Sequence, residues 1–256
     1  MTVLAFLPPR LLRHLEFVLG RERTLVVAES WDDMEALIRT QPVSVAVVHP
    51  LADGVQDTAR FERMIAAYPS LPVIAYVALS AEAFRAVAEL ARRGLEHVVL
   101  QAHDDSAERF LSLLDRVQGS RLTGQLVNAL RPSLNQLPIP VVKTVEEVFA
   151  EPHLYASARA IAINAKVPAV RLYRSFRAAD LASPKKLLIA ARLLRAYDYL
   201  SDPGCSVRGI SRKVGYRHPR IFAAHAFEVF ELSPSRLRSY VTEDQAIGRL
   251  LNWVHA

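Results

Sequence analysis

The sequence is poor in the residues on which several functions depend. It has one cysteine, Cys205, so no disulfide can form within the chain, and this fits a reducing compartment. None of its nine glycines forms a GxGxxG or Walker pattern, which excludes these glycine-rich phosphate loops. No Ser-His-Asp or Cys-His set is recognisable, and no histidine spacing indicates a metal site. We therefore expect no catalysis and no cofactor.

Long apolar runs are also absent. None approaches the roughly 20 residues of a membrane span, and no basic segment at the N-terminus leads into a secretory core. We expect a cytoplasmic protein of bacterial type with no membrane partner. A hydrophobic content of 51% argues against extended disorder, and 256 residues leave room for two domains with separate cores.

Charge divides the chain into two parts. Residues 1–118 hold 12 Lys and Arg against 16 Asp and Glu, a net charge of −4, whereas residues 119–256 hold 20 against 10, a net charge of +10. All five lysines lie in the second part. This asymmetry favours a polyanion-binding half joined to a half that does not touch the polyanion, although a solvated basic surface would give the same counts.

The first part alternates short apolar runs with helical patterns. These runs are too hydrophobic to form strands with one face exposed to solvent. Their alternation with helical patterns predicts a flavodoxin-like α/β domain with a five-stranded parallel sheet. The expected pairs are Val3–Leu7 with Leu11–Leu19, Thr24–Ala28 with Trp31–Ile38, Val43–Val48 with Thr58–Ala67, Pro72–Val77 with Ala81–Arg93, and His97–Leu100 with Ser106–Val117.

This rhythm, together with the loop Pro50–Gly54, resembles the receiver domain of two-component response regulators. A working receiver needs carboxylates at the ends of strands one and three, to bind Mg²⁺ and to accept the phosphoryl group. Here Leu7 and Pro8 replace the acidic pair, and the acceptor position falls on His49, or on Val48 if the register slips by one.

The remaining signature positions of a receiver are missing as well. The hydroxyl residue after strand four is Val77, and the lysine of strand five is Gln101. We therefore predict a pseudo-receiver that keeps the fold without the phosphorylation chemistry. Asp53 and Asp57 are alternative acceptors. His49 is expected to be structural, with an unusual acceptor, a metal ligand or a pH-responsive group as alternatives.

Residues 119–140 are expected to form a helical linker and a proline-containing boundary. Leucines recur at helical spacing up to Leu130, with a break near Gly119. Pro132 and then Pro138 and Pro140 are expected to end the helix, and the last two are expected to stiffen an extended segment. The apolar stripe of this segment could pack on the receiver-like sheet, or its later part, Leu122–Leu130, could pair with the same helix of a second subunit.

The second part contains two helix, turn, helix units separated by a long apolar helix that begins at Ser183-Pro184, a helix start signal. The pattern resembles the AraC/XylS family of transcription regulators. The residues that carry the resemblance are Leu172–Arg177, Ser183-Pro184, Arg192-Leu193, Ala196, Leu200, Ser206-Val207, Ile210, Val214–Tyr216, Phe222 and Leu232–Pro234. Departures occur where Leu181 and Glu231 replace the family's glycines, and where Ala224 and Ala226 replace an arginine and a phenylalanine.

The resemblance implies an all-helical domain that presents two recognition helices to double-stranded DNA. Base contacts are implied for Val170, Tyr173 and Arg174, and phosphate contacts are expected from Arg171 and Arg177. The other expected DNA-binding residues are Lys185, Lys186, Arg217, His218 and Arg220. Because alanine offers a base no more than a methyl contact, the second helix is expected to add phosphate affinity and little base discrimination.

Together these patterns predict a DNA-binding transcription regulator with a receiver-like domain (1–118), a linker (119–140), an AraC-type domain (141–240) and an amphipathic tail (241–256). Control would come from homodimerisation, a protein partner or a ligand at the first domain. The alternatives are an atypical phosphorylated response regulator that uses Asp53 or Asp57, and an interaction adaptor whose DNA-binding half has decayed.

Overall fold

The computed structural model describes residues 1–54, 58–117 and 121–255. Contacts divide the chain into one unit of Met1–Gly119 with Asp202–Gly204, and a second of Ser120–Ser201 with Cys205–Ala256. The expected boundary at 118 and 119, the helix break near Gly119, and Asp57 lie outside the described residues.

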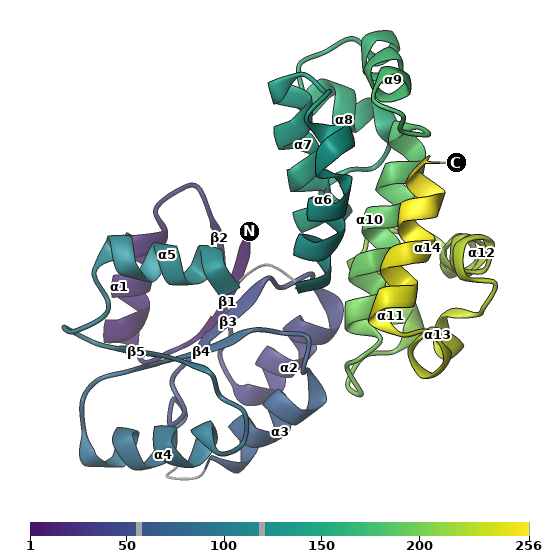
Figure 1. Ribbon diagram of the computed structural model, residues 1–256. Coiled ribbons are helices and arrows are strands. Elements are labelled where there is room, and N and C mark those ends of the chain that lie inside the picture. Colours follow the sequence, from purple (N-terminus) through teal and green to yellow (C-terminus); the bar gives the residue numbers. More distant parts are fainter. Residues whose placement is uncertain (55–57, 118–120, 256) are drawn as a thin grey trace. The chain divides into compact units, whose positions relative to one another are not determined.

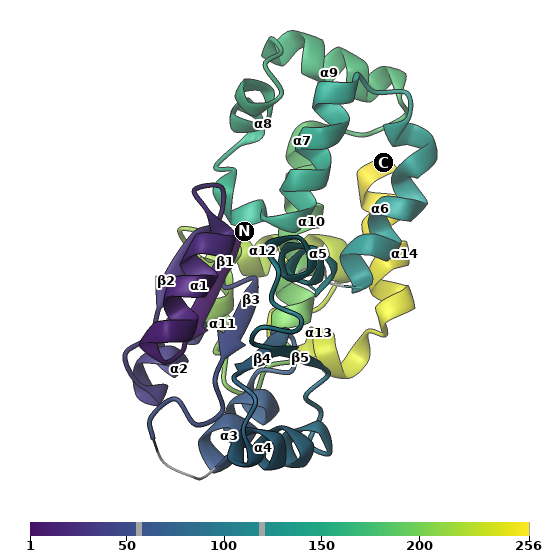
Figure 2. The same ribbon diagram turned by 90° about the vertical axis from the view of Figure 1, so that its left-hand side faces the viewer.

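The first unit is the expected α/β fold. Its parallel sheet has the order β2-β1-β3-β4-β5, which is the flavodoxin-like order, and helices cover both faces (Figures 1 and 2). The strands are β1 (Thr2–Phe6), β2 (Thr24–Val27), β3 (Val45–Val48), β4 (Val73–Val77) and β5 (His97–Leu100). The helices are α1 (Pro9–Leu19), α2 (Trp31–Thr40), α3 (Ala59–Ala67), α4 (Ala81–Ala91) and α5 (Ala107–Val117).

Burial explains why the central strands are apolar throughout. Every residue of β3 and β4 is buried, because α1 and α5 pack on one face of the sheet while α2 and α3 pack on the other. On the second face Phe6 makes an edge contact with Trp31 of α2, which in turn contacts Phe61 of α3. The central strands therefore lack the alternating polar face of an exposed sheet, whereas the edge strands β2 and β5 are only partly buried, contrary to the expectation from their apolar sequences.

The second unit is helical throughout its described residues. Its helices are α6 (Arg121–Leu134), α7 (Ile139–Ala150), α8 (Ala158–Asn164), α9 (Ala169–Ala178), α10 (Pro184–Tyr199), α11 (Val207–Lys213), α12 (Pro219–Phe230), α13 (Pro234–Tyr240) and α14 (Glu243–His255), with a short 3-10 helix at Pro152–Leu154. Helix α10 runs through the centre and contacts α6, α7, α8, α9, α11, α12 and α14 (Figure 1). It is therefore buried on nearly all sides, not only on the single face that the sequence pattern predicts.

Residues 121–140 differ in part from the expected linker: they contain the expected helix, but Pro132, which was expected to end it, lies inside α6. Leu122, Leu126, Leu130 and Leu134 of α6 are buried in the core of the second unit. Pro138 and Pro140 do not stiffen an extended stretch, because Pro138 is the N-cap of α7 and Pro140 lies in its first turn. Proline is tolerated there since the first N–H groups of a helix have no intrahelical partner. The prolines thus start a helix.

The C-terminal segment forms helix α14, which packs against α10, α6 and α12. Its buried residues are Ala246, Leu250 and Val254, whereas Leu251 and Trp253 are only partly buried. The buried face of α14 is therefore rotated around the helix axis, by about one residue position, from the face that its larger apolar side chains predict. No described helix is long and apolar enough to cross a membrane.

Candidate nucleic-acid interface

Helices α8 and α9 form the first helix-turn-helix. The Ser157 side chain caps α8 by accepting a hydrogen bond from the Ala160 N–H, and Lys166 makes the turn in the left-handed region with φ of 53°. Leu172 and Phe176 of α9 are fully buried, as the spacing predicts. Burial of this side of α9 leaves the opposite side exposed to solvent.

Polar contacts hold the first helix-turn-helix on α7. The Asn164 side-chain nitrogen donates to a Glu147 carboxylate oxygen at 2.7 Å and to the Tyr155 hydroxyl oxygen at 3.0 Å. The Tyr155 hydroxyl donates to the same Glu147 oxygen at 2.9 Å, and burial raises the pKa of this phenol. Helix α7 therefore holds the C-terminal end of α8 in place.

The outward side of α9 carries the residues implied in base and phosphate contact. The exposed side chains there are Val170, Arg171, Tyr173, Arg174 and Arg177. Within the described part of the chain, no ion pair or side-chain hydrogen bond engages any of the three guanidinium groups. Three unpaired cations on one helical face are suited to a polyanionic ligand.

Helices α11 and α12 form the second helix-turn-helix. The Ser206 hydroxyl caps α11 by accepting from the Gly209 N–H at 3.1 Å, as expected. Gly215 makes the turn with φ of 90°, and a Cβ at this position would lie 3.0 Å from the His153 Cα. Glycine is thus needed both for its backbone conformation and for the close approach.

The N-terminal end of α12 presents the remaining expected cations. Arg217, His218 and Arg220 are exposed, and His218 is the N-cap residue. Behind them, Phe222 and Ala226 are buried. The tyrosine of the turn, Tyr216, places its hydroxyl 3.0 Å from the His225 Nδ1, and burial lowers the pKa of His225. This hydrogen bond joins the turn to α12.

Arg192 of α10 links the two helix-turn-helix units. Its Nη2 donates to the Tyr155 carbonyl oxygen at 2.6 Å, just before α8, and its guanidinium lies 5.0 Å from the ring centroid of Tyr216, in the turn before α12. Burial lowers the pKa of Arg192. The sequence pattern indicates an arginine that flanks the apolar face, and it misses this positioning role because the contacts come from distant segments.

Lys213 is also not a surface cation. It is 3% exposed, and its Nζ lies 3.8 Å from the Tyr199 ring centroid and 3.9 Å from the Cys205 Sγ. The cation–π contact partly compensates for the loss of water around the ammonium group. Lys213 therefore joins α11 to α10, and it does not contribute to a DNA-binding surface.

The two lysines at the start of α10 differ from each other. Lys185 is exposed, whereas Lys186 is partly buried, with its Nζ 4.5 Å from the Trp253 ring of α14. The Trp253 Nε1 donates to the Lys186 carbonyl oxygen at 3.2 Å. Of this pair, only Lys185 offers an open cation to a phosphate.

In the first unit, His49 follows β3 at the expected acceptor position. Its Nδ1 accepts a hydrogen bond from the Leu51 N–H at 3.1 Å, and burial lowers its pKa. This is the geometry of a structural neutral histidine. No group of three or more potential ligands among the described residues could hold a metal ion.

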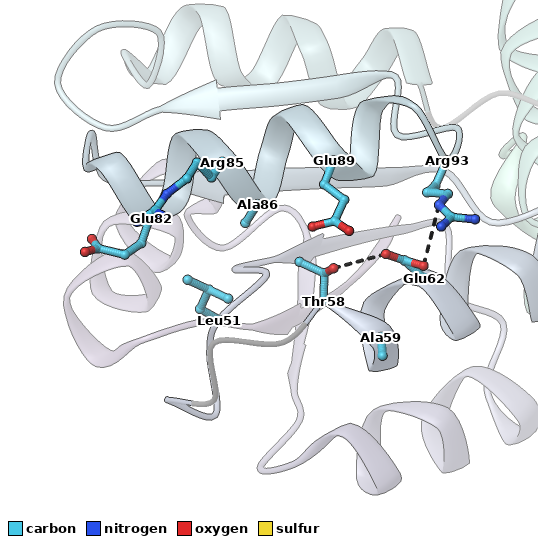
Figure 3. A pocket seen from close by; sticks show the side chains of 9 residues that line it. All are labelled: Leu51, Thr58, Ala59, Glu62, Glu82, Arg85, Ala86, Glu89 and Arg93. Atoms are coloured by element: carbon cyan, nitrogen blue, oxygen red, sulfur yellow. Dashed lines mark hydrogen bonds and ion pairs between the residues drawn. The ribbon is translucent and has the colours of Figure 1, made fainter.

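Two cavities lie in the first unit, beside the loop that follows His49. One, of about 470 Å³, is lined by residues that include Trp31, Asp53 and Arg60. The other, of about 330 Å³, lies between α3 and α4, where Thr58 donates to Glu62 and Arg93 pairs with the same carboxylate (Figure 3). The two cavities have linings of mixed charge, which do not select one class of ligand.

Comparison with known families identifies a helix-turn-helix domain. The family model described as "Helix-turn-helix domain" matches residues 161–240, from within α8 to the end of α13. No curated protein and no solved structure matches the chain. The match supports the resemblance to the AraC family over these residues, and with it a DNA-binding transcription regulator. Helices α6, α7 and α14 lie outside the matched range.

Proposed function

We propose that this protein is a sequence-specific regulator of transcription in which α9 is the principal DNA-reading helix. The observation that carries the proposal is the set of three exposed and unpaired guanidinium groups on α9, within the matched helix-turn-helix domain. Arg174 donates two hydrogen bonds to guanine O6 and N7 in the major groove, while Arg171 and Arg177 contact phosphates and fix the register.

Both helix-turn-helix units act together in this proposal. Helix α10 contacts α8 and α9 as well as α11 and α12, and Arg192 joins Tyr155, just before α8, to Tyr216 in the turn before α12. A rigid connection reduces the conformational entropy that is lost when both units engage one duplex. Lys185, Arg217, His218 and Arg220 supply further phosphate contacts.

Selection from a randomised duplex pool tests this function directly. With the full chain we expect enrichment of a defined site and an affinity that falls steeply as salt rises, because cations that neutralise phosphates release counterions. A flat base distribution together with a shallow salt dependence would contradict DNA reading. A flat distribution with a steep salt dependence would indicate binding without specificity.

We further propose that the first unit is a pseudo-receiver that controls DNA binding through a homodimer, a protein partner or a ligand. The proposal is supported by the flavodoxin-like sheet and by Leu7, Pro8 and His49 at strand ends where the receiver chemistry requires carboxylates. After incubation with acetyl phosphate and Mg²⁺, we expect the intact mass to be unchanged. A gain of one phosphoryl group would instead favour the alternative acceptor Asp53 or Asp57.

A further inference from the structure

Helix α14 lies outside the matched domain, yet its C-terminal end is bonded to the connection between α9 and α10. The Ala182 N–H donates to the Val254 carbonyl oxygen at 2.7 Å. The His255 Nδ1 lies 2.7 Å from the Asp180 carbonyl oxygen, which can only accept a hydrogen bond. The Trp253 Nε1 donates to a carbonyl oxygen in the first turn of α10. The C-terminal end of α9 is therefore attached to α14.

The same helix is attached to the end of the second helix-turn-helix. The Arg249 guanidinium donates a hydrogen bond to the carbonyl oxygen of Phe230, the last residue of α12. The last carbonyl groups of a helix have no intrahelical partner, and a cation beside them interacts favourably with the helix dipole. Just before α14, the Tyr197 hydroxyl of α10 donates to the Val241 carbonyl oxygen at 2.7 Å. Helix α14 thus holds α12 and is itself held by α10.

The two attachment points on α14 are close together. Arg249 and Val254 are separated by a rise of about 7.5 Å in an α-helix, so one rigid element joins the C-terminal ends of α9 and α12. Arg192 acts at the opposite ends, because its partners Tyr155 and Tyr216 precede α8 and α12. A helix held only at its start can pivot, whereas α12 is held at both ends.

We infer that α14 sets the position of α12 relative to α9, and that Arg249 is the positioning residue at the α12 end. A duplex repeats every 34–36 Å or about one turn, so two helices that bind one duplex must keep a fixed separation. Arg217 and Arg220, near the N-terminal end of α12, then reach the same phosphates in every complex. The role in DNA binding rests on the proposed function, whereas the fixed separation can be measured without DNA.

Distances between two spin labels, measured by double electron–electron resonance, test the fixed separation. The labels are attached through Ile163→Cys on α8 and Phe227→Cys on α12, because these side chains are 68% and 62% exposed, and Cys205→Ser removes the native thiol. With Arg249 present we expect one narrow distance distribution. Arg249→Ala should broaden it, and Arg249→Lys should restore it, because an ammonium group can donate to the same carbonyl oxygen.

The effect on DNA binding is measured with two duplexes. One holds the whole selected site, and the other is shorter by about one turn on the α12 side. Arg249→Ala should keep its affinity for the short duplex, because α9 is unchanged. On the long duplex it should lose up to about fivefold for each misplaced phosphate contact, the upper limit for an exposed ion pair. Asn252→Ala is the matched control, since Asn252 is exposed on α14 and has no side-chain hydrogen bond within the described residues.

Two outcomes would overturn the inference while leaving the proposed function intact. One is a distance distribution of Arg249→Ala that is as narrow as that of the unsubstituted chain. The other is an equal loss of affinity for both duplexes, which is the result of a general loss of stability. Absence of any site preference in the unsubstituted chain, together with a distribution that Arg249→Ala broadens, would instead overturn the proposed function and support the separation set by α14.

Discussion

Replacing Arg174 with alanine is expected to weaken binding to the selected site by about 5- to 150-fold while leaving binding to random duplex almost unchanged. This range corresponds to the about 1–3 kcal/mol of discrimination that a bidentate arginine–guanine contact supplies. Arg174 is exposed, and no described ion pair involves it, so its loss should not affect folding. Titration of labelled site and random duplex at one salt concentration measures the difference.

Arg177→Ala is the matched control for this prediction. As a phosphate contact, it should weaken binding to both duplexes to a similar extent and reduce the salt slope by about one. If Arg174→Ala behaved in the same way, Arg174 would be a phosphate contact and α9 would not read guanine at that position. Far-UV circular dichroism of both variants verifies that the helices are retained.

The second large effect concerns helix α6. A fragment that begins at residue 141 is expected not to fold, whereas one that begins at residue 120 should unfold cooperatively. Removal of α6 takes four buried leucines out of the core. Each contributes about 1.5–3 kcal/mol, and together they amount to much of the about 5–15 kcal/mol by which a domain is stable. Urea titration followed by circular dichroism distinguishes the two fragments.

Single substitutions in the full chain provide the control for this truncation. Leu126→Ala should lower the free energy of unfolding of the second unit by about 2–5 kcal/mol. Gln125→Ala, at an exposed neighbouring position on α6, should change it by less than about 0.5 kcal/mol. A cooperative transition in the fragment from residue 141, at the midpoint of the longer fragment, would show that α6 is dispensable.

The sequence predicts the fold class well because apolar periodicity reports burial directly. Runs such as Val45–Val48 are buried on both faces, and this requires helices on both sides of a parallel sheet. In the same way, Leu172 and Phe176 predict which side of α9 is exposed. These predictions depend on local patterns that the tertiary structure does not override.

Features that depend on distant contacts could not be predicted in this way. Pro138 and Pro140 indicate a boundary from local chemistry, yet the same chemistry permits the start of a helix, and α10 provides the surface on which α7 packs. The sequence pattern does not reveal the positioning role of Arg192, because its partners Tyr155 and Tyr216 lie far from it along the chain. Asp180 and Glu231 adopt the left-handed conformation that glycine favours. Before the first Ser-Pro, the residue in this conformation is therefore Asp180 and not Leu181, the position at which the sequence comparison places the family's glycine.

The packing of α6 beside α14 affects the order of events in folding. The two helices pack together, and an ion pair between Arg121 and Glu243 joins positions 122 residues apart. Most contacts within helix-turn-helix units are local and form quickly, whereas closure of so long a loop incurs an entropic cost before its contacts compensate for it. The second unit should consequently acquire its helices early and its closed core late, at a rate slower than that of helical domains with short-range topology.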